Sequence, residues 1–117
     1  MDLIGVAPRM PNPGETIVGT EFYTAPGGKG GNQAVTAAKM GAEVHMVGRV
    51  GQDVFGPMLL DSMKGNGVNI SRVSIDAGAP TGIALILLDS ARQNHIVQVP
   101  GANKTNSETI TDDAIEA

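Results

Sequence analysis

The chain has 117 residues, 41% of them hydrophobic, with a net charge of −4 and no cysteine. This composition supports a packed core and excludes a largely disordered chain, a basic nucleic-acid-binding surface, disulfides and cysteine-ligated zinc. No apolar run reaches the roughly 18 residues that a membrane helix needs, and the first residues lack the pattern of a signal peptide. We therefore expect a cytoplasmic protein with no nucleic-acid or membrane partner.

The first half of the chain predicts two strands, a helix and a third strand. Residues 3–6 form a short apolar run that prolines end, and residues 15–24 are rich in strand-forming side chains. Residues 32–40 are typical of a helix with small side chains, and Gly41 follows where a helix C-terminal glycine is common. A strand is predicted over residues 43–50.

The second half predicts a helix, three strands and a final helix. The helix begins near Pro57, since proline is tolerated in a first turn, and ends at residues 65–67. A strand over residues 68–75 precedes a hairpin of residues 81–89 and 95–99, and a last helix begins at Thr111 and runs to the final residue. This order indicates an α/β core with an added antiparallel sheet.

A glycine-rich stretch over residues 27–33 precedes the first predicted helix and has the clearest functional signal. Its glycines leave backbone amides unobstructed at a helix start, where a phosphate, a carboxylate or a polyhydroxylated ligand can bind. A Walker A loop would need Ser or Thr where Gly30 follows Lys29, and a dinucleotide loop would need glycine in place of Gln33. Spacing alone leaves a ligand loop and a plain glycine-rich turn equally favoured.

Blocks along the whole sequence resemble the ribokinase family, also called the phosphofructokinase-B family of carbohydrate kinases. The blocks occur in the family's order: Pro-Gly-Glu-Thr at 13–16, Pro-Gly-Gly-Lys-Gly-Gly-Asn-Gln-Ala at 26–34, Gly-Arg-Val-Gly-Gln-Asp-Val-Phe-Gly at 48–56, Thr-Gly-Ile-Ala at 81–84, Asn-His-Ile-Val at 94–97 and Pro-Gly-Ala-Asn at 100–103. The glycine-lysine block is the most specific of them.

The resemblance implies an α/β fold, a ribokinase-like three-layer sandwich that is present in part and carries an antiparallel β-lid. Residues 1–117 would be the N-terminal portion of one such domain, with lid strands at about 3–26 and 81–100 and α/β core at about 27–75 and 101–117. It further implies ATP-dependent phosphorylation of D-ribose to ribose 5-phosphate, with Mg²⁺ and K⁺ as cofactors and a homodimer formed through the lid.

Substrate-binding residues follow from the resemblance position by position. Asp2 matches an aspartate that binds sugar hydroxyls, and a carboxylate can accept from two neighbouring hydroxyls at once. The sugar-binding loop would comprise Gly27, Gly28, Lys29, Gly30, Gly31 and Asn32, and the lid positions Ala84 and Ile86 would cover the sugar with apolar surface. Without the resemblance, Asp2 would be a solvated carboxylate, Lys29 a surface lysine, and the lid positions simple core.

Other polar residues receive no role in the site. We assign none to His45 or His95, which lack metal-ligand spacing, and we expect no metal site in this chain. Asp112 and Asp113 are typical of a helix start, and Asn103 belongs to a family block without an assigned contact.

The sequence departs from the family in three places. Gly31 replaces a usual alanine, and Arg92-Gln93 replaces a usual Gly-Glu before a lid strand. The family's first strand with its Ser-x-Asn segment is absent, as is the C-terminal part, which would supply the nucleotide site, the metal sites and the catalytic aspartate. We therefore expect no catalytic residue in this chain, no turnover by it alone, and a poorly cooperative or aggregating fold.

Two alternatives remain open at this point. The same kinase fold could act on fructose, ketodeoxygluconate or adenosine instead of ribose. The chain could also be a non-catalytic module that dimerises through the lid.

Overall fold

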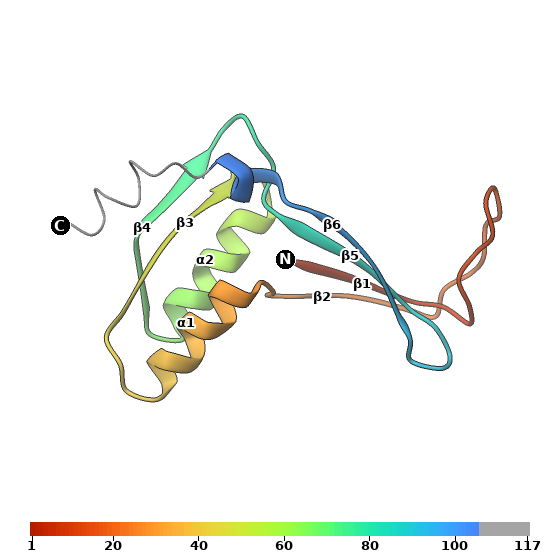
Figure 1. Cartoon of the computed structure of the whole chain (residues 1–117), viewed down its shortest axis with the longest axis horizontal. Coiled ribbons are helices and arrows are strands. Elements are labelled where there is room, and N and C mark those ends of the chain that lie inside the picture. Colours follow the sequence, from red (N-terminus) through yellow and green to blue (C-terminus); the bar gives the residue numbers. More distant parts are fainter. Residues whose placement is uncertain (106–117) are drawn as a thin grey trace.

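A computed structural model describes residues 1–105 and divides them into an α/β part and a projecting β-sheet (Figure 1). The radius of gyration is 16.5 Å, whereas a compact chain of this length would have about 13 Å. The difference reflects the projecting sheet, which extends the longest axis to 52 Å. The helix predicted from Thr111 lies outside the described residues.

Four strands form the projecting sheet, which we call the outer sheet. Its order is β2-β1-β5-β6, with a parallel β1–β5 pair between two antiparallel pairs. The strands are β1 (Asp2–Val6), β2 (Glu21–Ala25), β5 (Ile83–Leu88) and β6 (Asn94–Val99). The strands therefore come from both ends of the described chain, with the α/β part inserted between β2 and β5.

Strand β2 is shorter than predicted. The prediction of a strand over residues 15–24 was wrong for its first half, because β2 begins at Glu21. Glu15 is instead held in a loop, where its carboxylate accepts two hydrogen bonds from the Arg9 guanidinium group and one from the Asn12 amide. Pairing begins only where Thr20 donates its backbone N–H to the Val6 carbonyl oxygen at 2.8 Å. Since Pro8 closely follows the end of β1 and cannot donate to a ladder, β1 offers a partner over only five residues.

The α/β part packs two helices on one face of a two-stranded parallel sheet, which we call the inner sheet. Ala34, Met63 and Val68 form its buried cluster, and aliphatic residues of both helices and both strands pack around them. The elements are α1 (Lys29–Lys39), β3 (Val44–Gly51), α2 (Phe55–Gly65) and β4 (Val68–Asp76). The small side chains of α1 allow it to lie close to the sheet, as the sequence predicts.

Helix α1 begins three residues earlier than the predicted Asn32, at Lys29. Gly28 takes a φ of 95° as the N-cap residue, so the chain turns into the helix before the second glycine pair. Gly41 has a φ of 92° after the last turn, which confirms it as the C-terminal glycine. Helix α2 likewise ends before Gly67, whose φ is 85°.

The predicted hairpin of β5 and β6 is confirmed, with slightly different ends. Asp89 accepts hydrogen bonds from the backbone amides of Ala91 and Gln93, which closes the turn. Thr81 does not belong to β5, because its side chain is buried against Asp53. After β6, a short 3-10 helix, η1 (Gly101–Thr105), returns the chain to the inner sheet.

Helices α1 and α2 are too short and polar to cross a bilayer, and no other helix in the described part of the chain is long and apolar enough.

Candidate functional site

The start of α1 presents free backbone amides where the α/β part meets the outer sheet. The first backbone hydrogen bond of the helix runs from the Asn32 amide to the Gly28 carbonyl at 3.0 Å. No side chain caps the helix, and its first turn contains no acidic residue. The preceding N–H groups and the positive end of the helix dipole are therefore available to an electron-rich ligand.

Asp2 lies against this loop through a direct contact with Gly27. A Cβ added to Gly27 would fall 2.6 Å from Oδ2 of Asp2, well inside contact distance. Asp2 is the first residue of β1, where it pairs with Ala25 on one side and Ala84 on the other. Small residues on both neighbouring strands leave the carboxylate accessible beside the loop.

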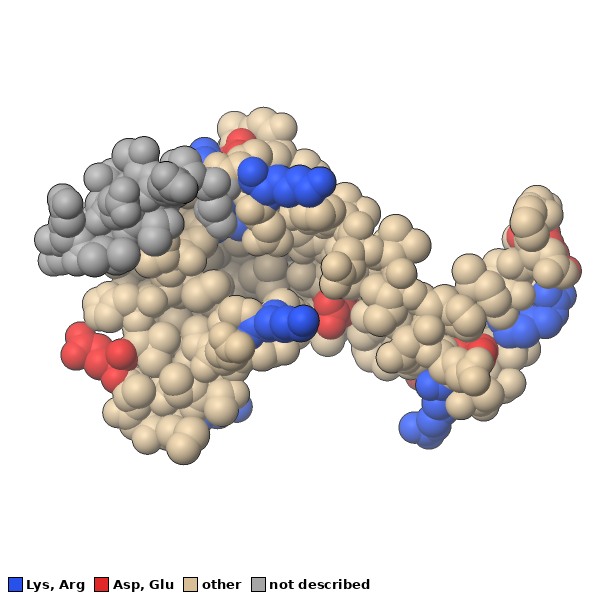
Figure 2. All heavy atoms as spheres, viewed as in Figure 1, with Lys and Arg blue, Asp and Glu red and all other residues tan. Residues whose placement is uncertain are grey.

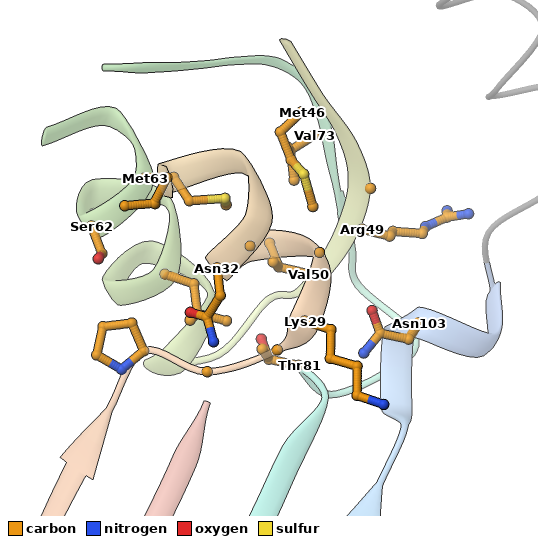
Figure 3. A pocket seen from close by; sticks show the side chains of 18 of the residues that line it. Lys29, Asn32, Met46, Arg49, Val50, Ser62, Met63, Val73, Thr81 and Asn103 are labelled. Atoms are coloured by element: carbon orange, nitrogen blue, oxygen red, sulfur yellow. The ribbon is translucent and has the colours of Figure 1, made fainter. Parts of the chain in front are cut away.

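A cavity of about 490 Å³ extends from the glycine-rich loop between α1, α2 and β3 (Figure 3). Its volume is in the range of pockets that bind small molecules, about 300–1,000 Å³. Its lining combines polar side chains, such as Asn32 and Ser62, with aliphatic ones, such as Val50 and Leu59. The lining residues are Pro26, Gly27, Gly28, Lys29, Gly30, Gly31, Asn32, Val35, Thr36, Met46, Val47, Gly48, Arg49, Val50, Leu59, Ser62, Met63, Asn66, Val73, Thr81 and Asn103.

Lys29 and Asn103 lie on the same side of the cavity mouth, one from α1 and one from η1 (Figure 3). The Asn103 amide nitrogen packs on Gly82, where an added Cβ would also meet the Pro100 carbonyl oxygen at 2.7 Å. Lys29 is exposed and, within residues 1–105, makes no ion pair. Its ammonium group is therefore free to donate to a ligand.

Arg49 also lines the cavity, but its guanidinium group has partners within the protein. One Nη donates to the Thr105 carbonyl at 2.9 Å, and Nε lies 3.4 Å from Oδ2 of Asp76 in an ion pair without a hydrogen bond. The Thr105 hydroxyl donates to the same carboxylate oxygen at 2.7 Å. Hydrogen bonds from Thr105 and Gly78 hold the pKa of Asp76 below its ordinary value. This cluster fastens η1 to the ends of β3 and β4.

Asp53 lies next to Thr81, which lines the cavity, and its side chain accepts four hydrogen bonds. Its carboxylate accepts hydrogen bonds from the backbone amides of Phe55 and Gly56 and from both the amide and the hydroxyl of Thr81. Burial alone would raise the pKa of Asp53, but these hydrogen bonds outweigh it and leave the pKa below its ordinary value. Asp53 is therefore ionised at neutral pH.

The structure gathers most of the predicted substrate-binding residues at this one place. The six residues of the predicted loop, 27–32, line the cavity, and Asp2 touches Gly27. Ala84 and Ile86 share a face of the outer sheet with Asp2, because Ala84 pairs with Asp2 and Ile86 with Ile4, but they do not line the cavity.

Sequence reasoning missed Thr81, Arg49 and Asn103 as cavity-lining residues. Each belongs to one of the family-like blocks, so the blocks carried a signal that these positions matter. Their contacts depend on the return of the chain from the outer sheet, which no local pattern reveals.

Charges do not gather into a basic patch on the face shown in Figure 2. The same view shows the surface hollowed between the α/β part and the outer sheet, next to a basic and an acidic side chain.

Known proteins match the chain along nearly its whole length. The family described as pfkB family carbohydrate kinase matches residues 1–116. A ribokinase from Bacillus subtilis is 47% identical over 103 residues, and a deoxyribokinase from Salmonella typhimurium is 36% identical over 116 residues. The structure of an Arabidopsis thaliana ribokinase, solved as a complex with ribose and ATP, superposes with a TM-score of 0.89 at 38% identity and covers 98% of this chain.

The matched region is a minor share of these relatives. It makes up 35% of the Bacillus subtilis protein, 38% of the Salmonella typhimurium protein and 38% of the Arabidopsis thaliana chain. The described residues thus have part of a ribokinase-like α/β sandwich together with the sheet that projects from it, which confirms the predicted fold class.

Proposed function

Because this chain belongs to the pfkB family of carbohydrate kinases, we propose that the complete protein phosphorylates a small sugar with ATP. D-Ribose is the first candidate substrate and ribose 5-phosphate the product. The ribokinases among the relatives support this choice.

The observation that carries the proposal is the contact of Asp2 with the glycine-rich loop. The Asp2 carboxylate, which accepts hydrogen bonds, lies against Gly27, and Gly27 lines the same cavity as Lys29, whose ammonium group donates them, and the glycine-rich loop. Adjacent hydroxyls of a sugar both donate and accept, so this combination suits a polyhydroxylated ligand better than a phosphate, which the Asp2 charge would repel. The site binds and orients the sugar, and orientation is a major contribution to phosphoryl transfer.

The outer sheet would act as the lid over this sugar. Ala84 and Ile86 share the face that bears Asp2, so closure would bring apolar side chains over the ligand and exclude water. The opposite face exposes Phe22, Leu85 and Val97, at 72%, 45% and 61% of their surface. An apolar area of this kind supports our expectation of a homodimer formed through the outer sheet.

ATP would be the phosphoryl donor, with Mg²⁺ and K⁺ as the ions implied by the family resemblance. Within residues 1–105, no three His, Cys, Asp or Glu side chains gather closely enough to hold a metal ion. The family resemblance implies that the catalytic base and the nucleotide-binding residues lie outside this chain, and the cytoplasm is the expected compartment.

A second substrate, 2-deoxyribose, has support from the Salmonella typhimurium deoxyribokinase, which matches 99% of this chain. The two sugars differ by one hydroxyl. A site that hydrogen-bonds this hydroxyl would discriminate strongly against its absence, because polar groups would then remain unpaired.

The test is steady-state kinetics of the complete protein with a panel of ribose, deoxyribose, fructose, ketodeoxygluconate and adenosine. We expect the highest kcat/KM with ribose. The Asp2→Asn variant should raise the ribose KM by about 10- to 100-fold, the loss expected for hydrogen bonds to a charged group. The matched change Asp61→Asn, on the exposed side of α2, should leave the KM unchanged. Absence of ADP formation with every sugar would contradict the proposal.

A further inference from the structure

One carboxylate connects the α/β part to the outer sheet. Oδ1 of Asp53 accepts from the Phe55 and Gly56 amides at 3.1 and 3.0 Å, at the start of α2. The same carboxylate accepts from Thr81, with the hydroxyl 2.6 Å from Oδ1 and the amide 2.7 Å from Oδ2. Thr81 stands two residues before β5, so this group bridges a helix start and the entry to the outer sheet.

Thr81 is held from the inner sheet as well. Its side chain is 2% exposed, and its hydroxyl accepts a hydrogen bond from the Gly51 amide at the end of β3, at 2.9 Å. A Cβ added to Gly51 would meet the Ala79 carbonyl oxygen at 2.5 Å, so the connection from β4 passes tightly over this glycine. Buried hydrogen bonds of this kind specify one position for the segment, because an alternative position would leave polar groups unpaired.

Thr81 is linked to the sugar site through the first residues of β5. Three residues after Thr81, Ala84 pairs with Asp2 in the parallel β1–β5 ladder. Asp2 in turn contacts Gly27 of the loop. A shift of Thr81 would therefore move β5 relative to the loop and carry Asp2 with it.

We propose that Asp53 is a positioning residue: through Thr81 it sets the placement of the outer sheet on the α/β part, and thereby the affinity for sugar. This inference rests on the proposed function, since the ligand it concerns is the sugar. Asp53 does not line the cavity, and its link to the outer sheet runs through Thr81.

Asp53→Asn in the complete protein is the direct test. The amide would replace one acceptor oxygen with an NH₂ group that faces the Thr81 donors. We expect the ribose KM to rise at least fivefold, while the ATP KM stays within twofold of the unmodified protein. The matched control Asp61→Asn makes the same carboxylate-to-amide change at an exposed position of α2, and it should alter neither KM nor the melting temperature.

Thr81 provides the second pair of variants, which keeps the inference testable if Asp53→Asn does not fold. Thr81→Val removes the hydroxyl that joins Asp53 to Gly51 and should raise the ribose KM. Thr81→Ser retains this hydroxyl and should restore the KM to within about twofold. A lower melting temperature with an unchanged ribose KM in Asp53→Asn, or equal KM values for Thr81→Val and Thr81→Ser, would overturn the inference.

Hydrogen–deuterium exchange separates this inference from the proposed function. Without any sugar, Asp53→Asn should speed amide exchange in β1 and β5 relative to Asp61→Asn. If the unmodified protein phosphorylates no sugar, the proposed function fails, but faster exchange would still show that Asp53 positions the outer sheet. Unchanged exchange in β1 and β5 would show that Asp53 does not position the outer sheet.

Discussion

Asp2 and Gly27 lie so close together that a side chain at Gly27 would displace the Asp2 carboxylate. The hypothetical Cβ of Gly27 would lie 2.6 Å from Oδ2 of the Asp2 carboxylate. The obstructing atoms belong to the end of a flexible side chain, so a methyl group at Gly27 can be accommodated by moving the carboxylate. A substitution there should therefore affect the site more than the fold.

Gly27→Ala tests this relationship. We expect the ribose KM of the complete protein to rise at least tenfold, because the carboxylate leaves its position beside the loop, while the melting temperature changes by only a few degrees. Steady-state kinetics and thermal unfolding measure the two effects. Gly65→Ala is the matched control, since Gly65 ends α2 with nothing within 4 Å of an added Cβ. An unchanged KM in Gly27→Ala would mean that the contact does not position Asp2 for binding.

Arg92 should be replaceable by glycine with a gain in stability. Its φ of 59° is the only positive value among the non-glycine residues described, and a left-handed conformation costs a non-glycine residue about 1–2 kcal/mol. Part of this gain is offset by the greater freedom of glycine in the unfolded chain. We therefore expect Arg92→Gly to raise the free energy of unfolding by about 0.5–1 kcal/mol, as measured by urea denaturation.

Arg72 offers the comparison for that variant, because it lies inside β4. Arg72→Gly should destabilise the protein, since glycine weakens a strand interior. Equal effects of the two substitutions would show that the conformation of Arg92 is not the cause.

Acid should destabilise the fold through its hydrogen-bonded aspartates. The pKa values of Asp53, Asp76 and Asp89 all lie below the ordinary 3.8, because hydrogen bonds favour the charged form in the folded state. The stability that they contribute is present above pH 3.8 and is lost as the pH falls through the lower folded-state values. Unfolding free energy measured from pH 7 to pH 2 should therefore fall mainly below pH 4.

Asp53→Asn should make that acid dependence shallower, because one of the titrating carboxylates is removed. An identical slope would show that the Asp53 hydrogen bonds do not favour its ionised form.

The 117-residue chain by itself should unfold without a sharp transition. Its buried apolar residues are few, and no large side chain in the described region is fully buried. Strands β3 and β4 pair only with each other among the described strands, so the inner sheet has two edges at which other chains can pair. Circular dichroism during heating should show a broad, concentration-dependent change. A sharp two-state melt of a monomer would contradict this expectation.

The helices and the strands of the α/β part were predictable because their apolar periodicity and terminal glycines are local signals. Gly41 and Gly67 ended helices as expected, since a positive φ favours glycine whatever surrounds it. The error over residues 15–24 arose where strand propensity was high but no partner strand was long enough. Propensity describes a single segment, whereas a strand also needs a partner.

The sequence alone determined the family, the order of the elements and the glycine-rich loop, because each of them is recognised from short patterns of neighbouring residues. Only the tertiary structure decided that Asp2 touches Gly27, that Ala84 and Ile86 share its face, and that Asp53 binds Thr81. These relationships join residues 25 to 84 positions apart in the chain. Their distances depend on how the outer sheet pairs across the inserted α/β part, and strand pairing is a property of the assembled fold.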